Sequence, residues 1–108
     1  MSDVPEIDIE TLEELLGEGA SLVDVREPDE YVEVHVPGAV LVPLATVPDS
    51  LTAFPADGPV YVICKSGARS GRAVQWLRTQ GIEATNVAGG TDAWVRTGKA
   101  QATGDEPG

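Results

Sequence analysis

Short apolar runs alternate with amphipathic segments along most of this chain. Runs rich in Val and Ile predict buried strands, and apolar residues at helical spacing predict helices. The predicted strands are residues 7–9, 21–25, 60–63 and 82–87, with one more directly after the Pro37-Gly38 turn. The predicted helices are residues 11–16, 71–80 and 91–97, with a helix that begins near Pro28 and a short one within 43–51. Strands that alternate with helices are typical of an α/β domain.

The chain is long enough for one domain, and two domains are not expected. It has 108 residues, of which 42% are apolar, as in a globular protein that buries one core without disulfides or a structural metal. We expect residues 1–100 to form this domain. Residues 101–108 are expected to be a flexible C-terminal tail.

Acidic residues dominate the charge. Eighteen Asp and Glu against seven Lys and Arg give a formal charge of −11 at pH 7. Nucleic acids and anionic membrane surfaces are bound through clustered Lys and Arg, and no such run is present, so neither partner is expected. The chain also has no apolar stretch long enough to span a bilayer and no basic, apolar leader at its start. These features predict a cytoplasmic location.

The charges are unevenly distributed along the sequence. Twelve acids and one base, Arg26, lie within residues 1–34, whereas the other six bases all follow Cys64. The acids within residues 6–18 are interpreted as one solvated face. A second hypothesis is adaptation to high salt, for which a gain of stability in molar KCl is the test.

Cys64 is the single cysteine, so an internal disulfide and a Cys-based zinc site are excluded. It directly follows the predicted strand 60–63 and precedes a small, glycine-containing loop and a helix. Open α/β sheets bind ligands at this position, where backbone N–H groups and the helix dipole favour anions. Lys65 and Arg69 add positive charge. These features favour a thiolate nucleophile, and the alternative is a small, buried apolar residue.

The length of the loop separates two chemistries that use such a cysteine. Cys64 and Arg69 are spaced as C-x4-R, one residue shorter than the C-x5-R loop of cysteine phosphatases. A phosphoryl group needs donors for several oxygens, whereas a persulfide adds a single sulfur atom. The short loop therefore favours transfer of a sulfane sulfur over hydrolysis of a phosphate ester.

Four segments with glycine, charged or aromatic residues stand out along the chain. They are Val23-Asp24-Val25-Arg26 with Glu27 and Tyr31, His35-Val36-Pro37-Gly38-Ala39, Cys64-Lys65-Ser66-Gly67-Ala68-Arg69-Ser70, and Gly89-Gly90 with Trp94 and Gly98. In this order they resemble a single-domain rhodanese, a sulfurtransferase, over residues 7–98. The resemblance implies a three-layer α/β fold with a mostly parallel, five-stranded sheet flanked by helices. After Gly98 the family often continues with Pro and an apolar segment, whereas here Lys99-Ala100-Gln101 follows.

The resemblance also implies the roles of the loop residues and the class of partner. Cys64 is implied to be the nucleophile that carries the sulfur as a persulfide. The implied substrate-binding cradle is Lys65, Ser66, Gly67, Ala68 and Arg69. The implied partners are a small anionic sulfur donor, thiosulfate or a persulfide, and a thiophilic acceptor: cyanide, a thiol or a sulfur-accepting protein. No metal or organic cofactor is implied.

Two alternatives to a sulfurtransferase stay open at this point. The first is a non-catalytic rhodanese-like module that binds a partner or acts as a sensor. An activated thiol beside Arg69 argues against it, because pure binding needs neither. The second is a small cysteine phosphatase or arsenate reductase, which the short loop disfavours.

The other polar residues near these motifs are interpreted as mainly structural. Asp24 and Arg26 lie at the end of a predicted strand and are expected to form a fixed pair, with orientation of the substrate as the alternative. Ser70 is expected to support the loop. His35 is the only histidine, and because it precedes a Pro-Gly turn it is expected to make structural hydrogen bonds.

Overall fold

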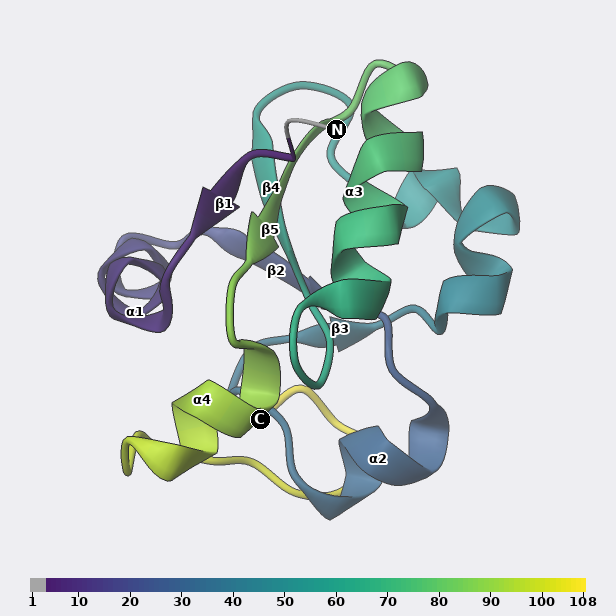
Figure 1. The fold of residues 1–108 in the computed structure, drawn as a ribbon. Helices are drawn as coiled ribbons and strands as arrows, with labels where there is room; N and C mark the ends of the chain where they lie inside the picture. The colour runs from purple at the N-terminus through teal and green to yellow at the C-terminus, as the bar shows by residue number, and fades with distance from the viewer. Residues whose placement is uncertain (1–3) are drawn as a thin grey trace.

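A computed structural model describes residues 4–108, which form one sheet with helices on both faces (Figure 1). The strands are β1 (Glu6–Ile7), β2 (Ser21–Asp24), β3 (Val40–Leu41), β4 (Pro59–Ile63) and β5 (Glu83–Val87). The α-helices are α1 (Ile9–Gly17), α2 (Pro28–Glu33), α3 (Ala68–Thr79) and α4 (Gly90–Arg96), and two 3-10 helices, η1 (Leu44–Asp49) and η2 (Leu51–Ala53), follow β3. The strand order is β1-β5-β4-β2-β3, and all neighbouring strands are parallel.

Each face of the sheet carries its own apolar core. On one face, α3 and η1 contribute Val74, Leu77 and Val47. On the other face, α1 and α4 contribute Leu12 and Trp94. The result is three layers, with the sheet between two layers of helices (Figure 1). The predicted fold class is therefore confirmed.

The helix boundaries differ from the predicted ones where a local contact or conformation sets them. α1 begins earlier than predicted because the Asp8 carboxylate caps it and accepts the Thr11 N–H at 2.9 Å. α3 also begins earlier, at Ala68, directly after Gly67 in the left-handed conformation. The short helix expected after β3 takes a 3-10 form, and Pro48, which has no N–H to donate, lies inside it.

The carboxyl ends of β2 and β4 meet at one edge of the sheet. Asp24 is in register with Ile63, and the Val25 N–H donates to the Ile63 carbonyl at 3.0 Å. Because Cys64 directly follows Ile63, the residues after both strands lie together where open parallel sheets bind ligands.

The C-terminal segment packs beside α2. His35 and Ala102 exchange two backbone hydrogen bonds of 2.9 Å, and the Gly104 N–H donates to the Val32 carbonyl at 2.8 Å. The segment passes between α4 and α2 (Figure 1). Flexibility of residues 101–108 therefore stays a prediction, and these contacts count against it.

Candidate active site around Cys64

Cys64 lies at the base of the loop that joins β4 to α3, with only 1% of its surface exposed. Gly67 has a φ of +109°, which glycine adopts easily and other residues rarely do. This conformation turns the chain so that the Gly67 N–H donates to Cys64 Sγ at 3.1 Å. The Ser70 hydroxyl lies 3.3 Å from the same sulfur. The thiol is therefore surrounded by hydrogen-bond donors at the N-terminus of a helix.

These donors lower the pKa of Cys64. Burial by itself raises the pKa of a thiol and acts against ionisation here. The Ser70 hydroxyl and the backbone N–H groups of Ser70, Gly67 and Ser66 outweigh burial, so the pKa lies below its usual value. A lower pKa means that more of the cysteine is thiolate at neutral pH, and the thiolate is its nucleophilic form.

The Ser70 hydroxyl has one proton and two acceptors. Its oxygen lies 3.3 Å from Cys64 Sγ and 2.5 Å from Asn86 Oδ1. The amide of Asn86 is oriented by its own Nδ2, which donates to the Gly67 carbonyl and to Glu6, each at 3.1 Å. A hydroxyl donates to one acceptor at a time, so Ser70 bonds either the thiolate or Asn86. Formation of the thiolate favours the first of these states.

The Gly89-Gly90 turn closes the loop from the α4 side. The Thr91 N–H donates to the Cys64 carbonyl at 2.9 Å, and the Asp92 N–H donates to the Lys65 carbonyl at 3.0 Å. A Cβ on Gly90 would lie 2.5 Å from both of these carbonyl oxygens, closer than real Cβ atoms come. Glycine at position 90 is therefore required by the close approach of two backbone segments.

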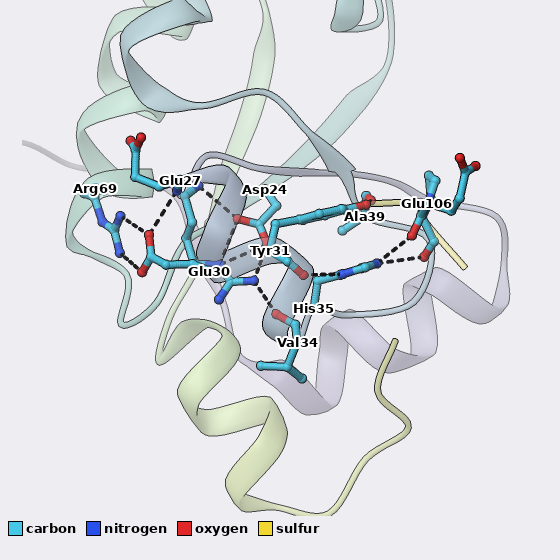
Figure 2. A network of polar contacts seen from close by, with 11 residues as sticks. Asp24, Glu27, Glu30, Tyr31, Val34, His35, Ala39, Arg69 and Glu106 are labelled. Atoms are coloured by element: carbon cyan, nitrogen blue, oxygen red, sulfur yellow. Dashed lines mark hydrogen bonds and ion pairs between the residues drawn. The ribbon is translucent and has the colours of Figure 1, made fainter. Parts of the chain in front are cut away.

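Arg69 is bound by a side chain of α2. Its two terminal nitrogens donate to Glu30 Oε1 and Oε2 at 2.8 and 2.9 Å, as Figure 2 shows. The hydrogen bond from this guanidinium lowers the pKa of Glu30 to about 2. The pair is partly exposed, with 33% and 27% of the two side chains accessible. This ion pair links residues 65–69, the cysteine loop, to α2.

Comparison with known proteins identifies the family. The rhodanese-like domain family matches residues 8–97. The chain belongs to the rhodanese-like family. A protein named sulfurtransferase from Allochromatium vinosum is 39% identical over 98 residues, which cover 88% of this chain and 92% of that protein. The thiosulfate sulfurtransferase GlpE of Pseudomonas fluorescens is 30% identical over 108 residues and 99% of both chains.

A solved structure of the same family has the same fold. The rhodanese-like domain protein of Staphylococcus aureus is 34% identical, with a TM-score of 0.84 over 93% of this chain and 98% of that one. The resemblance found in the sequence is therefore confirmed over nearly the whole rhodanese-like domain.

Asp24 and Arg26 form a buried ion pair at the end of β2, which neighbours the end of β4 and the cysteine loop. Arg26 Nη2 donates to Asp24 Oδ2 at 2.9 Å, and Nε donates to both carboxylate oxygens at 3.0 and 3.1 Å. The same Nη2 donates to the Val34 carbonyl at 2.7 Å, so the pair fixes the end of α2 (Figure 2). Both side chains are committed to these contacts, which fits the structural interpretation of the pair.

The remaining cradle residues lie at the surface. Lys65, Ser66 and Ala68 are exposed, and the side chains of Lys65 and Ser66 form no hydrogen bond or ion pair with the other residues of 4–108. Of the three, Ser66 acts on Cys64 through its backbone, because its N–H is one of the groups that lower the pKa of the thiol. Their role in binding substrate stays a prediction.

The sequence analysis did not predict the roles of two residues that hold the loop, Asn86 and Glu30. Asn86 occupies a buried position of β5, and a polar residue inside a predicted buried strand was an available signal. Glu30 lies in an acidic helix, where nothing in the pattern separates a carboxylate that pairs with Arg69 from one that faces solvent. Such a partner is set by the tertiary fold.

Within residues 4–108, His, Cys, Asp and Glu side chains nowhere gather in a group of three that could hold a metal ion. None of the helices in the same range combines the length and the apolar character that crossing a bilayer requires.

Proposed function

We propose that this chain moves a sulfane sulfur from thiosulfate or a persulfide to a thiophilic acceptor, through a persulfide on Cys64. In the first half-reaction the Cys64 thiolate attacks the outer sulfur of thiosulfate. The S–S bond of thiosulfate breaks, its electron pair leaves on sulfite, and Cys64 carries the transferred sulfur as a persulfide anion. In the second, cyanide or a thiolate attacks that outer sulfur, and the electron pair returns to Cys64.

The observation that carries this proposal is the set of donors around Cys64 Sγ. The Gly67 N–H at 3.1 Å and the Ser70 hydroxyl at 3.3 Å favour a thiolate before reaction. The same donors, with the first-turn N–H groups of α3, suit the negative outer sulfur of a persulfide. The thiolate fraction of Cys64, which its lowered pKa increases, reacts without a general base.

The cradle acts in this proposal mainly through its backbone. The backbone N–H groups of Ser66, Gly67 and Ser70 act on the sulfur, and Lys65 supplies a positive charge beside the loop. Both terminal nitrogens of Arg69 are already bonded to Glu30. We therefore assign Arg69 the main role of anchoring the loop, and contact with the substrate is its secondary role. Asp24, Arg26 and Ser70 support the site.

Thiosulfate is the donor to test first. The relative from Pseudomonas fluorescens that matches almost the full chain is named a thiosulfate sulfurtransferase. The acceptor is a thiol, cyanide or a sulfur-accepting protein, and neither a metal nor an organic cofactor takes part in the two steps. A cytoplasmic location, where thiols stay reduced, suits a persulfide carrier with a single cysteine.

Intact-mass spectrometry after incubation with thiosulfate tests the proposal. We expect wild type to gain one sulfur atom and to lose it on addition of cyanide. Cys64→Ser, which is nearly isosteric and has no thiol, is expected to gain nothing and to lose all sulfur transfer while it keeps its circular-dichroism spectrum. A gain of sulfur by Cys64→Ser would contradict the assignment of the nucleophile.

Thiosulfate and persulfide donors are separated by the same measurement. Loading by a low-molecular-weight persulfide but not by thiosulfate would restrict the donor class to persulfides. If neither donor loads a protein whose Cys64 still reacts with iodoacetamide, the sulfurtransferase proposal fails and a binding module becomes the better reading.

A further inference from the structure

The side chain of Asn86, on β5, joins three parts of the molecule next to the cysteine. The residue is buried, with 2% of its surface exposed. Its Nδ2 donates to the Gly67 carbonyl in the loop and to Glu6 Oε2 on β1, each at 3.1 Å. Its Oδ1 lies 2.5 Å from the hydroxyl oxygen of Ser70, in the first turn of α3. One amide therefore holds β1, the cysteine loop and α3 together.

These contacts decide which way the Ser70 proton points before reaction. The two partners of Asn86 Nδ2, a carbonyl and a carboxylate, accept hydrogen bonds and do not donate them, so they hold the amide in one orientation. Oδ1 then faces Ser70 and can only accept, which makes the Ser70 hydroxyl the donor. Its other acceptor, Cys64 Sγ, is 3.3 Å away. While that sulfur is uncharged, the shorter bond to Asn86 holds the proton.

A charge on Cys64 Sγ reverses this preference. Hydrogen bonds to an ionised acceptor are about twice as strong as bonds between neutral groups, and the Asn86 oxygen is neutral. Ionisation of Cys64 therefore turns the Ser70 hydroxyl from Asn86 to Sγ. In a persulfide the charge lies on the outer sulfur, one bond beyond Sγ, and Sγ itself is uncharged. The hydroxyl then returns to Asn86, and backbone N–H groups of the loop meet the charge of the outer sulfur.

We propose that Asn86 is a positioning residue for sulfur transfer, which accepts the Ser70 proton whenever Cys64 Sγ is uncharged and releases it whenever Sγ is a thiolate. The part that concerns the persulfide rests on the proposed function. In the first half-reaction Sγ loses its charge as it bonds the transferred sulfur, and the hydroxyl turns to Asn86. In the second the electron pair returns to Sγ, and the hydroxyl turns back to stabilise the leaving thiolate. The proton stays on the Ser70 oxygen throughout.

This role predicts an effect of Asn86 that is opposite in sign to that of a loosened loop. Ser70 is fully buried, so its hydroxyl has no solvent to bond when Asn86 is absent. Without Asn86, ionisation of Cys64 no longer breaks a hydrogen bond, and the pKa of Cys64 should fall. A loop that merely loosens would carry donors away from the sulfur, and the pKa of Cys64 would rise.

The pH dependence of Cys64 alkylation by iodoacetamide measures this sign in Asn86→Leu. The change leaves the Gly67 carbonyl bonded to the Gly71 N–H at 3.0 Å and leaves the Glu6 carboxylate exposed to water. We expect the alkylation profile of Asn86→Leu to move to lower pH than that of wild type. When the same change is added to Ser70→Ala, the profile should not move from that of Ser70→Ala.

Thr85→Val is the matched control for this change. Thr85 precedes Asn86 in β5, and because side chains alternate along a strand it lies on the opposite face of the sheet. Its alkylation profile should match wild type. The charged groups Glu6 and Arg69 lie beside the network and are present in all of these variants.

Sulfur loading at equilibrium gives a second measurement. At a fixed ratio of thiosulfate to sulfite, and at a pH where Cys64 is ionised in every variant, intact mass gives the ratio of persulfide to thiolate. We expect this ratio to be lower in Asn86→Leu by about fivefold, as the loss of one neutral hydrogen bond allows. In the Ser70→Ala background the same change should leave the ratio unaltered.

The outcomes separate this inference from the proposed function. An Asn86→Leu profile that stays in place, moves to higher pH, or moves equally with and without the Ser70 hydroxyl would overturn the inference. Failure to load sulfur would contradict the proposed function alone, because alkylation needs no sulfur donor.

NMR of the wild-type protein decides the question if Asn86→Leu and the smaller Asn86→Val both fail to fold. The side-chain amide signal of Asn86 should shift as Cys64 ionises, because Oδ1 then loses its hydrogen bond. The shift should be absent in Ser70→Ala and in Cys64→Ser, which keeps Glu6 and removes only the thiol. An amide signal that does not respond to the ionisation of Cys64 would refute the role of Asn86.

Discussion

Cys64 and His35 are each the only residue of their kind, and both are buried, yet their surroundings are opposite. Cys64 Sγ is met by donors, the Gly67 N–H and the Ser70 hydroxyl. The ring nitrogens of His35 are met by acceptors, the carbonyl oxygens of Tyr31, Glu106 and Pro107 (Figure 2).

The kind of partner explains why one residue is suited to chemistry and the other to structure. Donors stabilise a negative charge, so they prepare Cys64 to attack a sulfur atom. Acceptors on both sides of the ring receive its N–H, on whichever nitrogen the tautomer places it, so His35 links the C-terminal segment to α2. Burial and rarity in the sequence are the same for both residues and decide neither role.

Among changes that leave Cys64 itself in place, the largest expected effect comes from one that displaces the loop on the Cys64 side. In Gly90→Ala the new Cβ would meet the Cys64 and Lys65 carbonyl oxygens at 2.5 Å, so the loop must move. We expect sulfur transfer to fall by up to about a hundredfold, because misplacement by roughly 1 Å costs a reaction that much. Steady-state assays with thiosulfate and cyanide measure it.

Gly81→Ala is the matched control for this change. Gly81 also has a positive φ, of +83°, but a Cβ there would meet nothing within 4 Å. Both variants should lose about 1–2 kcal/mol of stability through backbone strain. Only Gly90→Ala should also lose sulfur-transfer activity per folded molecule. Equal activity in the two folded variants would show that the loop tolerates the contact.

The second change breaks the His35 side of the comparison. His35→Leu removes the ring hydrogen bonding to the carbonyl oxygens of Tyr31 and Glu106, which costs about 1–3 kcal/mol. Thermal unfolding measures the loss, and hydrogen exchange of the Ala102 and Gly104 N–H groups reports whether the tail is released. His35→Gln, which keeps one donor, should lose less. Activity per folded molecule is expected to stay unchanged, and a loss of it would move His35 into the site.

Much of the fold and of the loop could be predicted because each rests on local signals. Valine-rich runs gave the central strands, and the position of Cys64 between such a run and a glycine-containing loop pointed to the site before any contact was known. The motif order pointed to the family. These features depend on residues adjacent in sequence, where periodicity and turn chemistry act directly.

The parts that could not be predicted depend on distant residues. The bond between Asn86 and Ser70 joins β5 to α3, and the ion pair of Glu30 with Arg69 joins α2 to the loop. The docking of residues 101–108 on His35 is of the same kind, because polar residues at a chain end look solvated until a partner surface is known. Pairings of this type follow only from the tertiary arrangement.

A smaller effect is expected when one donor is removed from Cys64. Ser70→Ala takes away the hydroxyl that helps to lower the pKa of Cys64, so that pKa should rise. The thiolate then forms at higher pH, and the rate of alkylation by iodoacetamide plotted against pH moves in the same direction. Ser66→Ala removes an exposed hydroxyl of the same loop and keeps its N–H, so its profile should match wild type.

An unchanged alkylation profile in Ser70→Ala would have a definite meaning. It would show that the Ser70 proton stays on Asn86 Oδ1, 2.5 Å away, and that backbone N–H groups alone stabilise the thiolate. The Cys64 thiolate would then be stabilised by the backbone at Gly67 and at the start of α3, and not by a side chain.

The smallest expected effect concerns Glu30, whose charge holds the loop from outside. Hydrogen bonding from Arg69 lowers the pKa of Glu30 from 4.5 to about 2, so the stability it contributes is full above pH 4.5 and is lost as pH falls toward 2. Glu30→Gln should therefore be less stable than wild type at pH 6, by under about 1 kcal/mol for a partly exposed pair, and the difference should vanish near pH 2. Glu33→Gln, which changes an exposed carboxylate on the same helix outside the ion pairs of residues 4–108, should match wild type in stability at pH 6.

The same variant decides how Arg69 serves the site. If Arg69 mainly anchors the loop, as its two bonds to Glu30 indicate, Glu30→Gln loosens the loop and the KM for thiosulfate rises slightly. If Arg69 is instead a ligand of the donor that Glu30 restrains, the freed guanidinium binds thiosulfate better and the KM falls. We expect the rise, because a guanidinium with both terminal nitrogens on one carboxylate must break two charge-assisted bonds to reach a substrate.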